Sequence, residues 1–181
     1  MRVIAGEWRG RRLVAPLGDH TRPTSDRTRE AVFSMLGPLH EDLRVLDLFA
    51  GSGALGIEAL SRGAGFALFC DEDRRAASVI AENLRALDVG SDRGRLVRGD
   101  ARGVLREARR SAEAYDLVFL DPPYLLAQAL GTELQDDVAA VLAAGGRVVT
   151  ESGRRAPMTL DRLPMSKERR YGTTLIRIHT A

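Results

Sequence analysis

The regular alternation of short apolar runs with helical segments constrains the fold of this chain more than any other feature. Between Arg44 and Glu151, runs rich in Val, Leu and Phe are followed by segments with helical periodicity. This pattern is typical of βαβ units, which build a parallel sheet covered by helices. We predict strands at Val45–Phe49, Phe66–Cys70, Arg95–Arg98, Asp116–Leu120 and Arg147–Thr150. We predict helices near Ala54–Ser61, Arg74–Leu87, Ala101–Arg109 and Thr132–Ala143, with the pair Gly145-Gly146 as the stop of the last one.

The two ends of the chain depart from this alternation. In the tail, Arg169–Tyr171 and Thr173–Ile178 flank Gly172 and predict antiparallel strands that close one edge of the sheet. Residues 41–181 are therefore expected to form an α/β domain, a doubly wound, mainly parallel, seven-stranded Rossmann-like sheet with an antiparallel C-terminal strand.

Residues 1–40 are predicted to form a separate small appendage. Val3–Gly6 and Arg11–Val14 are expected to pair as a β-hairpin, and a helix is expected near Asp26–Leu36. Ser25 is a suitable N-cap for that helix, and Gly37 with the following proline is a suitable stop.

The formal net charge is only +2, but the charges are unevenly distributed. Residues 1–29 contain seven arginines and three acids, residues 147–181 contain eight basic residues and three acids, and the middle contains twelve basic and nineteen acidic residues. An acidic body with two basic ends suggests that a nucleic acid docks on the termini. On charge alone, a solvated arginine-rich surface explains the pattern equally well.

The remaining composition indicates the compartment. Cys70 is the only cysteine, which excludes an internal disulfide and fits a reducing cytoplasm. The three histidines lack ligand spacing, so no metal is expected. The sequence shows neither a membrane-spanning apolar run nor a signal peptide, and we expect a cytoplasmic protein without a membrane partner.

A glycine-rich turn follows the first predicted strand. Gly51, Gly53 and Gly56 form G-x-G-x-x-G, and Asp71 lies twenty residues beyond Gly51. Taken alone, this is the dinucleotide fingerprint, so an NAD-dependent oxidoreductase is one candidate. Asp47 speaks against it, because a carboxylate beside the turn would repel a pyrophosphate and attract a cationic amino group.

S-adenosylmethionine fits this turn better, since it carries an amino group, a ribose diol and an adenine but no phosphate. Asp47 would bind the amino group directly or through water, Asp71 the ribose hydroxyls, and Asp100 the adenine amine. Each acid alone could be only a helix cap or a loop residue, and Asp73 is best explained as an N-cap. The predicted cofactor-binding residues are Asp47, Phe49, Gly51, Gly53, Asp71, Asp100 and Ala101.

The motif Asp121-Pro122-Pro123-Tyr124 follows the fourth predicted strand. The two prolines have fixed φ and no N–H donors, so their carbonyls are available to accept hydrogen bonds from a ligand. Together with a carboxylate and an aromatic ring, they form a platform suited to a flat heterocycle with an exocyclic NH2. The structural alternative is a rigid strand-to-helix turn with a surface tyrosine.

With the glycine turn, Asp71, Asp100 and this motif in order, the chain resembles class I S-adenosylmethionine-dependent methyltransferases. Over nearly its whole length it is similar to the RsmD family of bacterial 16S ribosomal RNA guanine-N2 methyltransferases. The segments that carry this resemblance are Arg2–Gly6, Arg22–Thr24, Asp26-Arg27 with Arg29–Ala31, and Tyr171–Thr174. The departures are Asp71, where Glu is common, and arginine at nearly every basic position. The resemblance implies methylation of one guanine N2 in 16S rRNA within a 30S particle, and nothing in the sequence requires a dimer, so a monomer is expected.

Three residues of the motif are predicted to be catalytic: Asp121, Pro122 and Tyr124. A guanine amine is a poor nucleophile, because its lone pair is delocalised into the ring. Asp121 and the Pro122 carbonyl would each accept one N–H, which directs the lone pair at the methyl group and favours the transition state. Tyr124 would stack on a base turned out of its helix.

The predicted contacts to substrate RNA are Arg9, Arg11, Arg12, Arg22, Arg27 and Arg29. Phosphate contacts from these residues would make binding strongly salt-dependent. The alternative is that they pair with Glu7, Asp26 and Glu30, and Trp8 is available either to stack or to pack. Arg22–Thr24 is a candidate lid over the cofactor.

Three rival functions remain besides the oxidoreductase. A DNA adenine-N6 methyltransferase would use the same platform, which does not distinguish guanine from adenine, although the chain has no room for a large target-recognition domain. A protein-glutamine methyltransferase usually has Asn in the first position of the motif. A non-catalytic ribosome-assembly factor could retain the fold.

Overall fold

The structure is a computed structural model that describes residues 1–16 and 25–181. Its seven strands form one sheet in the order β3-β2-β1-β4-β5-β7-β6. The strands are β1 (Arg44–Leu48), β2 (Phe66–Asp71), β3 (Gly94–Arg98), β4 (Tyr115–Leu120), β5 (Leu142–Gly153), β6 (Met165–Tyr171) and β7 (Thr174–Thr180). Strands β1 to β5 pair in parallel, and β7 is antiparallel to both β5 and β6. The predicted fold class, a mainly parallel α/β sheet with an antiparallel C-terminal end, is confirmed.

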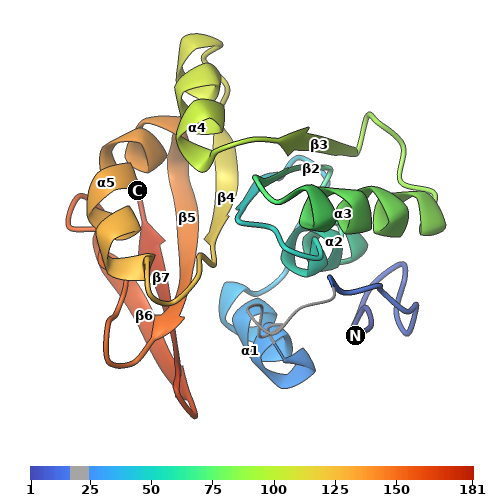
Figure 1. Ribbon diagram of the computed structural model, residues 1–181, viewed down its shortest axis with the longest axis horizontal. Helices are drawn as coiled ribbons and strands as arrows, with labels where there is room; N and C mark the ends of the chain where they lie inside the picture. The colour runs from blue at the N-terminus through green and yellow to red at the C-terminus, as the bar shows by residue number, and fades with distance from the viewer. Residues whose placement is uncertain (17–24) are drawn as a thin grey trace.

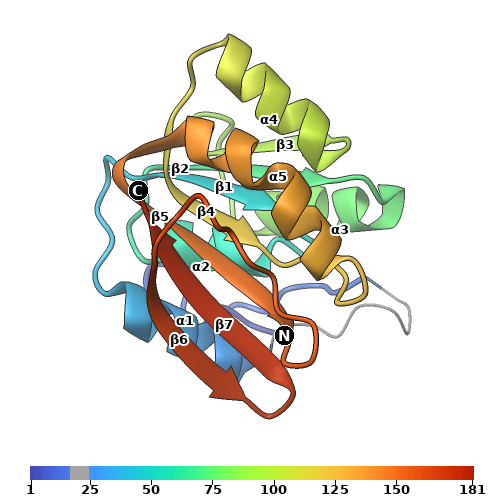
Figure 2. The ribbon, with the colours of Figure 1, turned by 90° about the vertical axis from the view of Figure 1, so that its left-hand side faces the viewer.

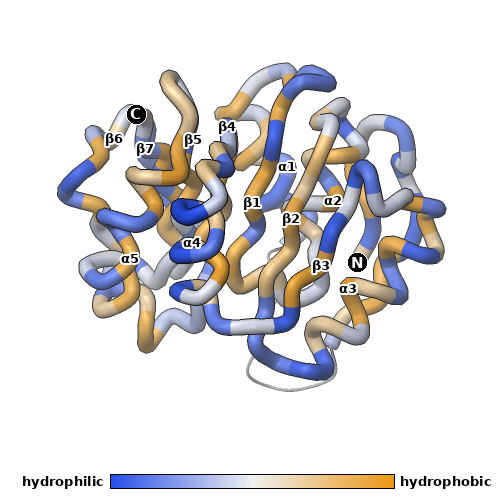
Figure 3. The backbone as a smooth tube through the Cα atoms, turned by 90° about the horizontal axis from the view of Figure 1, so that it is seen from above, coloured by the Kyte–Doolittle hydropathy of each residue, from blue (hydrophilic) through white to orange (hydrophobic). Residues whose placement is uncertain are grey.

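Helices cover both faces of the sheet, and this explains why the central strands are almost continuously apolar. The helices are α1 (Asp26–Leu36), α2 (Ala54–Ser61), α3 (Arg74–Ala86), α4 (Ala101–Arg110) and α5 (Ala127–Val141). Helices α1, α2 and α3 lie on one face, and α4 and α5 lie on the other (Figure 1). Seen from above, β1 and β2 are largely hydrophobic between these layers (Figure 3). No helix among the described residues is long and apolar enough to cross a membrane.

The register of the parallel strands brings their carboxyl ends to one edge of the sheet, which we call the site edge. Leu48 of β1 pairs with Cys70 of β2 and with Leu120 of β4, and Leu120 pairs with Thr150 of β5. The residues that follow these strands are therefore neighbours, although long stretches of sequence separate them. Because β7 is antiparallel to β5, its first residue, Thr174, also lies at this edge.

Two predicted boundaries around α5 and β5 are wrong. The helix begins at Ala127 rather than Thr132 and passes through Gly131, where a Cβ would lie 2.6 Å from the Thr159 carbonyl oxygen. A side chain would not fit at this position, because the backbone at Thr159, in the segment between β5 and β6, approaches the helix closely. The pair Gly145-Gly146 is not a helix stop, since it lies inside β5, near a register shift against β4.

The N-terminal residues form less of a hairpin than predicted. A single bridge joins Arg2 and Arg12, while the backbone N–H groups of Ile4 and Ala5 donate to the Glu58 carboxylate of α2 at 2.8 and 3.0 Å. Of the pairing predicted for Val3–Gly6, only the first residue takes part: Val3 donates to the Arg11 carbonyl and accepts from the Gly10 N–H, both at 2.9 Å, whereas at Ile4 and Ala5 a buried carboxylate takes the place of a strand partner. Trp8 is buried in the hydrophobic cluster of α1 and α2, so it packs. The predicted helix Asp26–Leu36 is confirmed, with the Ser25 hydroxyl accepting from the Thr28 N–H at its start.

Candidate active site

The glycine turn connects β1 to α2 at the site edge. Phe49, Gly51 and Gly53 have φ values of 62°, 58° and 77°, so the backbone there is left-handed, as glycine favours. A Cβ on Gly51 would meet no atom within 4 Å, which leaves open space over the turn. A Cβ on Gly56 would lie 2.4 Å from Cε1 of Phe69, so this third glycine lets α2 pack against β2.

Asp47 lies beneath the turn and is almost completely buried, with 1% of its surface exposed. Its Oδ2 atom accepts the Gly56 N–H at 2.9 Å. The pKa of Asp47 is raised to about 7: burial raises it most, the bond from Gly56 opposes the shift, and the nearby Asp71 carboxylate adds a smaller increase. The carboxylate thus holds the turn from below.

Asp71 organises the turn from the neighbouring strand. Its Oδ2 accepts the Gly51 N–H at 2.8 Å, and its Oδ1 accepts the Asp73 N–H at 2.9 Å. A carboxylate oxygen has two acceptor positions, so these bonds leave capacity for the hydroxyls of a ligand. Asp73 accepts from the Arg75 N–H and caps α3, which confirms its predicted role.

Asp100 is the N-cap of α4, where it accepts the Arg102 N–H at 3.1 Å and forms an ion pair with the same side chain. Its carboxylate remains 45% exposed, so a ligand can still reach it. Ala101, the first residue of the helix, is buried beside it.

The buried thiol of Cys70 shows that the predicted acids share one neighbourhood. Its pKa is raised to about 12, first by burial and then by the carboxylates of Asp71, Asp100 and Asp47. The site edge therefore carries a negative field, which disfavours a pyrophosphate and favours a cationic group.

The Asp121–Tyr124 motif leaves β4 at the centre of the site edge. The register of β4 with β1 and β5, continued by one residue, places Asp121 between Phe49 and Glu151. Pro122 is buried, and within the described part of the chain its carbonyl accepts no hydrogen bond. The Pro123 carbonyl, in contrast, accepts the Leu126 N–H at 2.8 Å. Only the first of the two proline carbonyls is therefore available to a ligand.

Two residues outside the predicted site, Glu151 and Thr174, fix the ring of Tyr124, and only Thr174 lies in a segment that carried the family resemblance. The Tyr124 hydroxyl is 3.1 Å from Oε1 of Glu151, to which it donates, and 2.8 Å from Oγ1 of Thr174. A Cβ on Gly153 would lie 3.4 Å from the ring, so the backbone of β5 packs against it. Burial raises the pKa of the Tyr124 phenol to about 12, so the hydroxyl stays protonated and can donate. An acid at the end of an apolar strand is the signal that could have identified Glu151.

The prediction that Arg29 contacts RNA is wrong, because its side chain is completely buried. Its Nη2 donates to the Arg2 carbonyl and pairs with Asp26 at 3.0 Å, and its Nε lies 3.7 Å from Oε2 of Glu58. A charged residue three positions from an acid on a helix is compatible with either a solvated or a buried location, so the sequence pattern did not reveal this burial.

The other predicted RNA contacts lie on the surface where the structure describes them. Arg9, Arg11, Arg12 and Arg27 are exposed, whereas Arg22 lies outside the described residues. Arg9 and Arg27 line one hollow of about 380 Å³ between the N-terminal turn and α1. Two arginines far apart in sequence thus face the same space.

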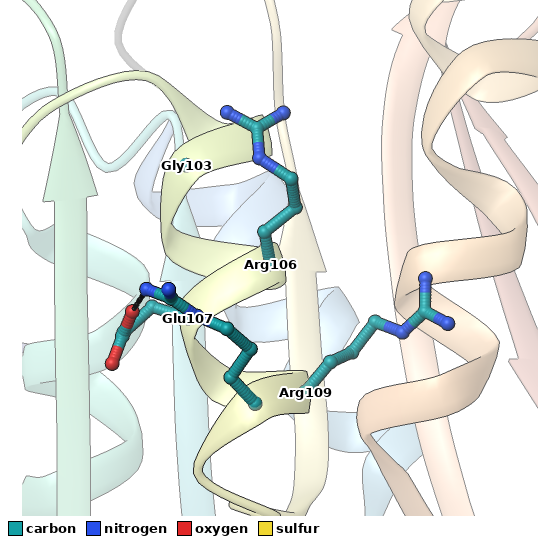
Figure 4. A pocket seen from close by; sticks show the side chains of 5 residues that line it. Gly103, Arg106, Glu107 and Arg109 are labelled. Atoms are coloured by element: carbon teal, nitrogen blue, oxygen red, sulfur yellow. Dashed lines mark hydrogen bonds and ion pairs between the residues drawn. The ribbon is translucent and has the colours of Figure 1, made fainter.

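A second hollow, of about 640 Å³, lies along α4 and is lined by Gly103, Arg106, Glu107, Arg109 and Arg110. Three of its five lining residues are arginines, and one of them, Arg110, forms an ion pair with Glu107 (Figure 4). Arg106 and Arg109 extend away from the helix in the same view. Among the described residues, no group of three or more potential ligands could hold a metal ion.

The chain is similar to a known protein family, to two proteins named as rRNA methyltransferases and to a solved structure. The family described as "Conserved hypothetical protein 95" matches residues 1–180. The "Putative rRNA methyltransferase YlbH" of Bacillus subtilis is 39% identical over 181 residues, which covers 99% of this chain and 98% of the relative. The "Ribosomal RNA small subunit methyltransferase D" of Escherichia coli is 42% identical over 124 residues, covering 68% of this chain and 60% of the relative. The solved structure of a "Putative methyltransferase yhhF" from Escherichia coli superposes with a TM-score of 0.82 at 34% identity, over 99% of this chain and 97% of the other.

Proposed function

The chain belongs to the RsmD family, and on that premise we propose that it transfers a methyl group from S-adenosylmethionine to the exocyclic N2 of a guanine in 16S ribosomal RNA. The proposed substrate is the RNA within a small-subunit particle, and the proposed setting is the cytoplasm, with the enzyme as a monomer. One observation carries the proposal: Asp121 and the unengaged Pro122 carbonyl stand beside an acid-lined glycine turn.

The residues of the turn fit S-adenosylmethionine. The cofactor supplies an electrophilic methyl group on a positively charged sulfur. The carboxylates of Asp47 and Asp71 suit its positive charges, and Asp71 keeps acceptor positions for the ribose hydroxyls. The open space over Gly51 admits a ligand against the backbone, and Asp100 with Ala101 would bind the adenine.

The motif residues would prepare the guanine amine for attack. Asp121 and the Pro122 carbonyl accept one N–H each, so the nitrogen lone pair is directed out of the base plane. As the new N–C bond formed and the bond between the methyl group and the sulfur broke, positive charge would pass from the sulfur, left as a neutral thioether, to the nitrogen, and both hydrogen bonds would strengthen. One proton then leaves the nitrogen, with the Asp121 carboxylate as the nearest acceptor among the proposed contacts. Tyr124 stacks on the base in an orientation fixed by Glu151 and Thr174.

The basic N-terminal surface would bind the RNA backbone. Arg9 and Arg27 border one hollow, and Arg11 and Arg12 are exposed on the turn that follows Trp8. Guanidinium groups suit phosphate oxygens because they donate two parallel hydrogen bonds. These contacts would position the RNA without reading its sequence.

The test is a methyl-transfer assay with labelled S-adenosylmethionine and, separately, 30S particles, naked 16S rRNA, DNA and total protein. Mapping of the modified nucleotide should give a single N2-methylguanine in 16S rRNA. Label at adenine in DNA, label in protein, or no label in any acceptor would each contradict the proposal. The Asp121→Ala variant, which lacks one of the two proposed acceptors, serves as the negative control.

A further inference from the structure

The turn of the β6–β7 hairpin lies beside Tyr124, although it is far along the chain from the Asp121–Tyr124 motif. Thr174, the first residue of β7, is hydrogen bonded to the Tyr124 hydroxyl, and Tyr171, the last residue of β6, pairs with Thr174. The turn and the end of β5 lie at the same end of the sheet (Figure 2). The hairpin is therefore part of the rim of the candidate active site.

Four arginines surround this turn, and we call them the hairpin arginines. They are Arg154 and Arg155, which directly follow β5, and Arg169 and Arg170, which precede the last residue of β6. All four are exposed. Only Arg170 has an acidic partner among the described residues, Glu168 at 2.9 Å, and that carboxylate is shared with Arg177.

Local structure holds this basic rim in place. The Arg154 N–H donates to the Thr173 carbonyl at 3.0 Å, and its guanidinium donates to the Gly172 carbonyl at 3.2 Å. The segment after β5 is thus tied to the hairpin turn. Arg155 and Arg169 form no ion pair within the described part of the chain, so their charges face solvent without an acidic partner.

Protection of an exposed sheet edge does not account for the whole set. Charged residues on an edge strand prevent pairing with other chains, and β6 is the edge strand of this sheet. That reason applies to Arg169 and Arg170, but Arg154 and Arg155 follow β5, which is paired on both sides. The feature that the four residues share is their position around the turn beside Tyr124.

We propose that the hairpin arginines form a second RNA-binding surface, which holds the phosphates of the nucleotides that flank the target base. This inference rests on the proposed function. It adds an RNA-binding surface in the C-terminal part of the chain to the surface proposed at Arg9 and Arg27 in the N-terminal part. A base stacked on Tyr124 brings its flanking backbone to the rim of the site, and a cluster of guanidinium groups suits that backbone.

The test compares three double variants for binding of 16S rRNA across a range of salt concentrations. Arg155→Gln/Arg169→Gln removes the two charges that have no acidic partner. The logarithm of the binding constant falls with the logarithm of the salt concentration by about 0.7 per phosphate contact. Loss of two contacts should therefore reduce the steepness of this dependence by about 1.4 and weaken binding about tenfold near 0.15 M salt. Arg155→Lys/Arg169→Lys keeps the charges and should bind nearly as wild type does. The control Arg109→Gln/Arg110→Gln removes two exposed charges from the last turn of α4 and should leave the slope unchanged.

Equal salt slopes for the wild type and the Gln pair would overturn the proposal, and so would an equal loss in the α4 control. If the Lys pair loses as much affinity as the Gln pair, local distortion and not charge is responsible, and the proposal also fails. Methyl transfer by the wild type separates this result from the proposed function. A wild type that methylates 16S rRNA while the Gln pair binds normally refutes only the hairpin surface, whereas a wild type that methylates no rRNA refutes the proposed function.

Discussion

Arg27 and Arg29 lie two residues apart on α1, and their replacement is expected to have opposite consequences. Arg29 is completely buried beside the equally buried Glu58, whereas Arg27 is exposed on the rim of the N-terminal hollow. We expect Arg29→Met to destabilise the fold. We expect Arg27→Gln to weaken RNA binding and to leave stability unchanged.

The expected loss of stability in Arg29→Met depends on the partners that Glu58 keeps when Arg29 is removed. Loss of one partner from a buried ion pair typically costs about 3–5 kcal/mol, because the other charge stays buried without compensation. Glu58 keeps Arg62 at 2.7 Å and the N–H groups of Ile4 and Ala5 at 2.8 and 3.0 Å. The expected cost is therefore near the lower limit, about 3 kcal/mol. For a chain of this length that corresponds to a fall in Tm of about 6–12 °C.

The assay is thermal and urea unfolding of both variants, followed by measurement of RNA affinity. An Arg29→Met protein that unfolds within about 1 kcal/mol of the wild type would refute the argument that a buried charge network anchors the N-terminal segment. An Arg27→Gln protein that loses as much stability as Arg29→Met would refute the assignment of separate roles to the two arginines.

Three further substitutions test the site edge. Asp121→Ala should lower kcat by about 10²–10³, by analogy with the loss of one transition-state hydrogen bond, while the Kd for S-adenosylmethionine stays near its wild-type value; near-normal turnover would contradict this. Folding raises the pKa of Asp47 from near 4 to about 7, so the native state binds more protons than the unfolded state in that window, and stability should fall as pH rises through it. The Asn side chain in Asp47→Asn does not titrate, so the urea unfolding midpoint of this variant should depend less on pH than that of the wild type. An unchanged pH dependence would show that Asp47 is not responsible. Tyr124→Phe keeps the ring but loses the contacts with Glu151 and Thr174. At a net value near ~1 kcal/mol for each of these two hydrogen bonds, kcat/KM should drop about thirtyfold, with a larger drop for Tyr124→Ala. Equal rates for the wild type and Tyr124→Phe would mean that the hydroxyl does not position the ring.

The elements that the sequence predicted well are those whose causes are local. Ser25 caps α1 through its own hydroxyl, and Gly37 follows the last residue of the helix, so a few adjacent residues define both ends. Strands β1 and β4 are mostly apolar and almost entirely buried because both of their faces are covered. The place of Gly131 inside α5, in contrast, depends on the close approach of Thr159 from a distant segment, which the neighbouring residues in the chain do not reveal.

By itself, the sequence determined the α/β alternation, the glycine turn and the order of the acids at the strand ends, because these depend on periodicity and on residues close together in the chain. Only the tertiary structure decided that Arg29 is buried, that the Pro122 carbonyl is unengaged while that of Pro123 is used, and that Glu151 and Thr174 hold Tyr124. The burial of Arg29 and the bonds of Tyr124 depend on partners dozens of residues away, whereas the engagement of the Pro123 carbonyl depends on how the chain turns back at Leu126. Desolvation and hydrogen bonding act through space, and the spacing of residues along the chain does not specify which partners they will bring together.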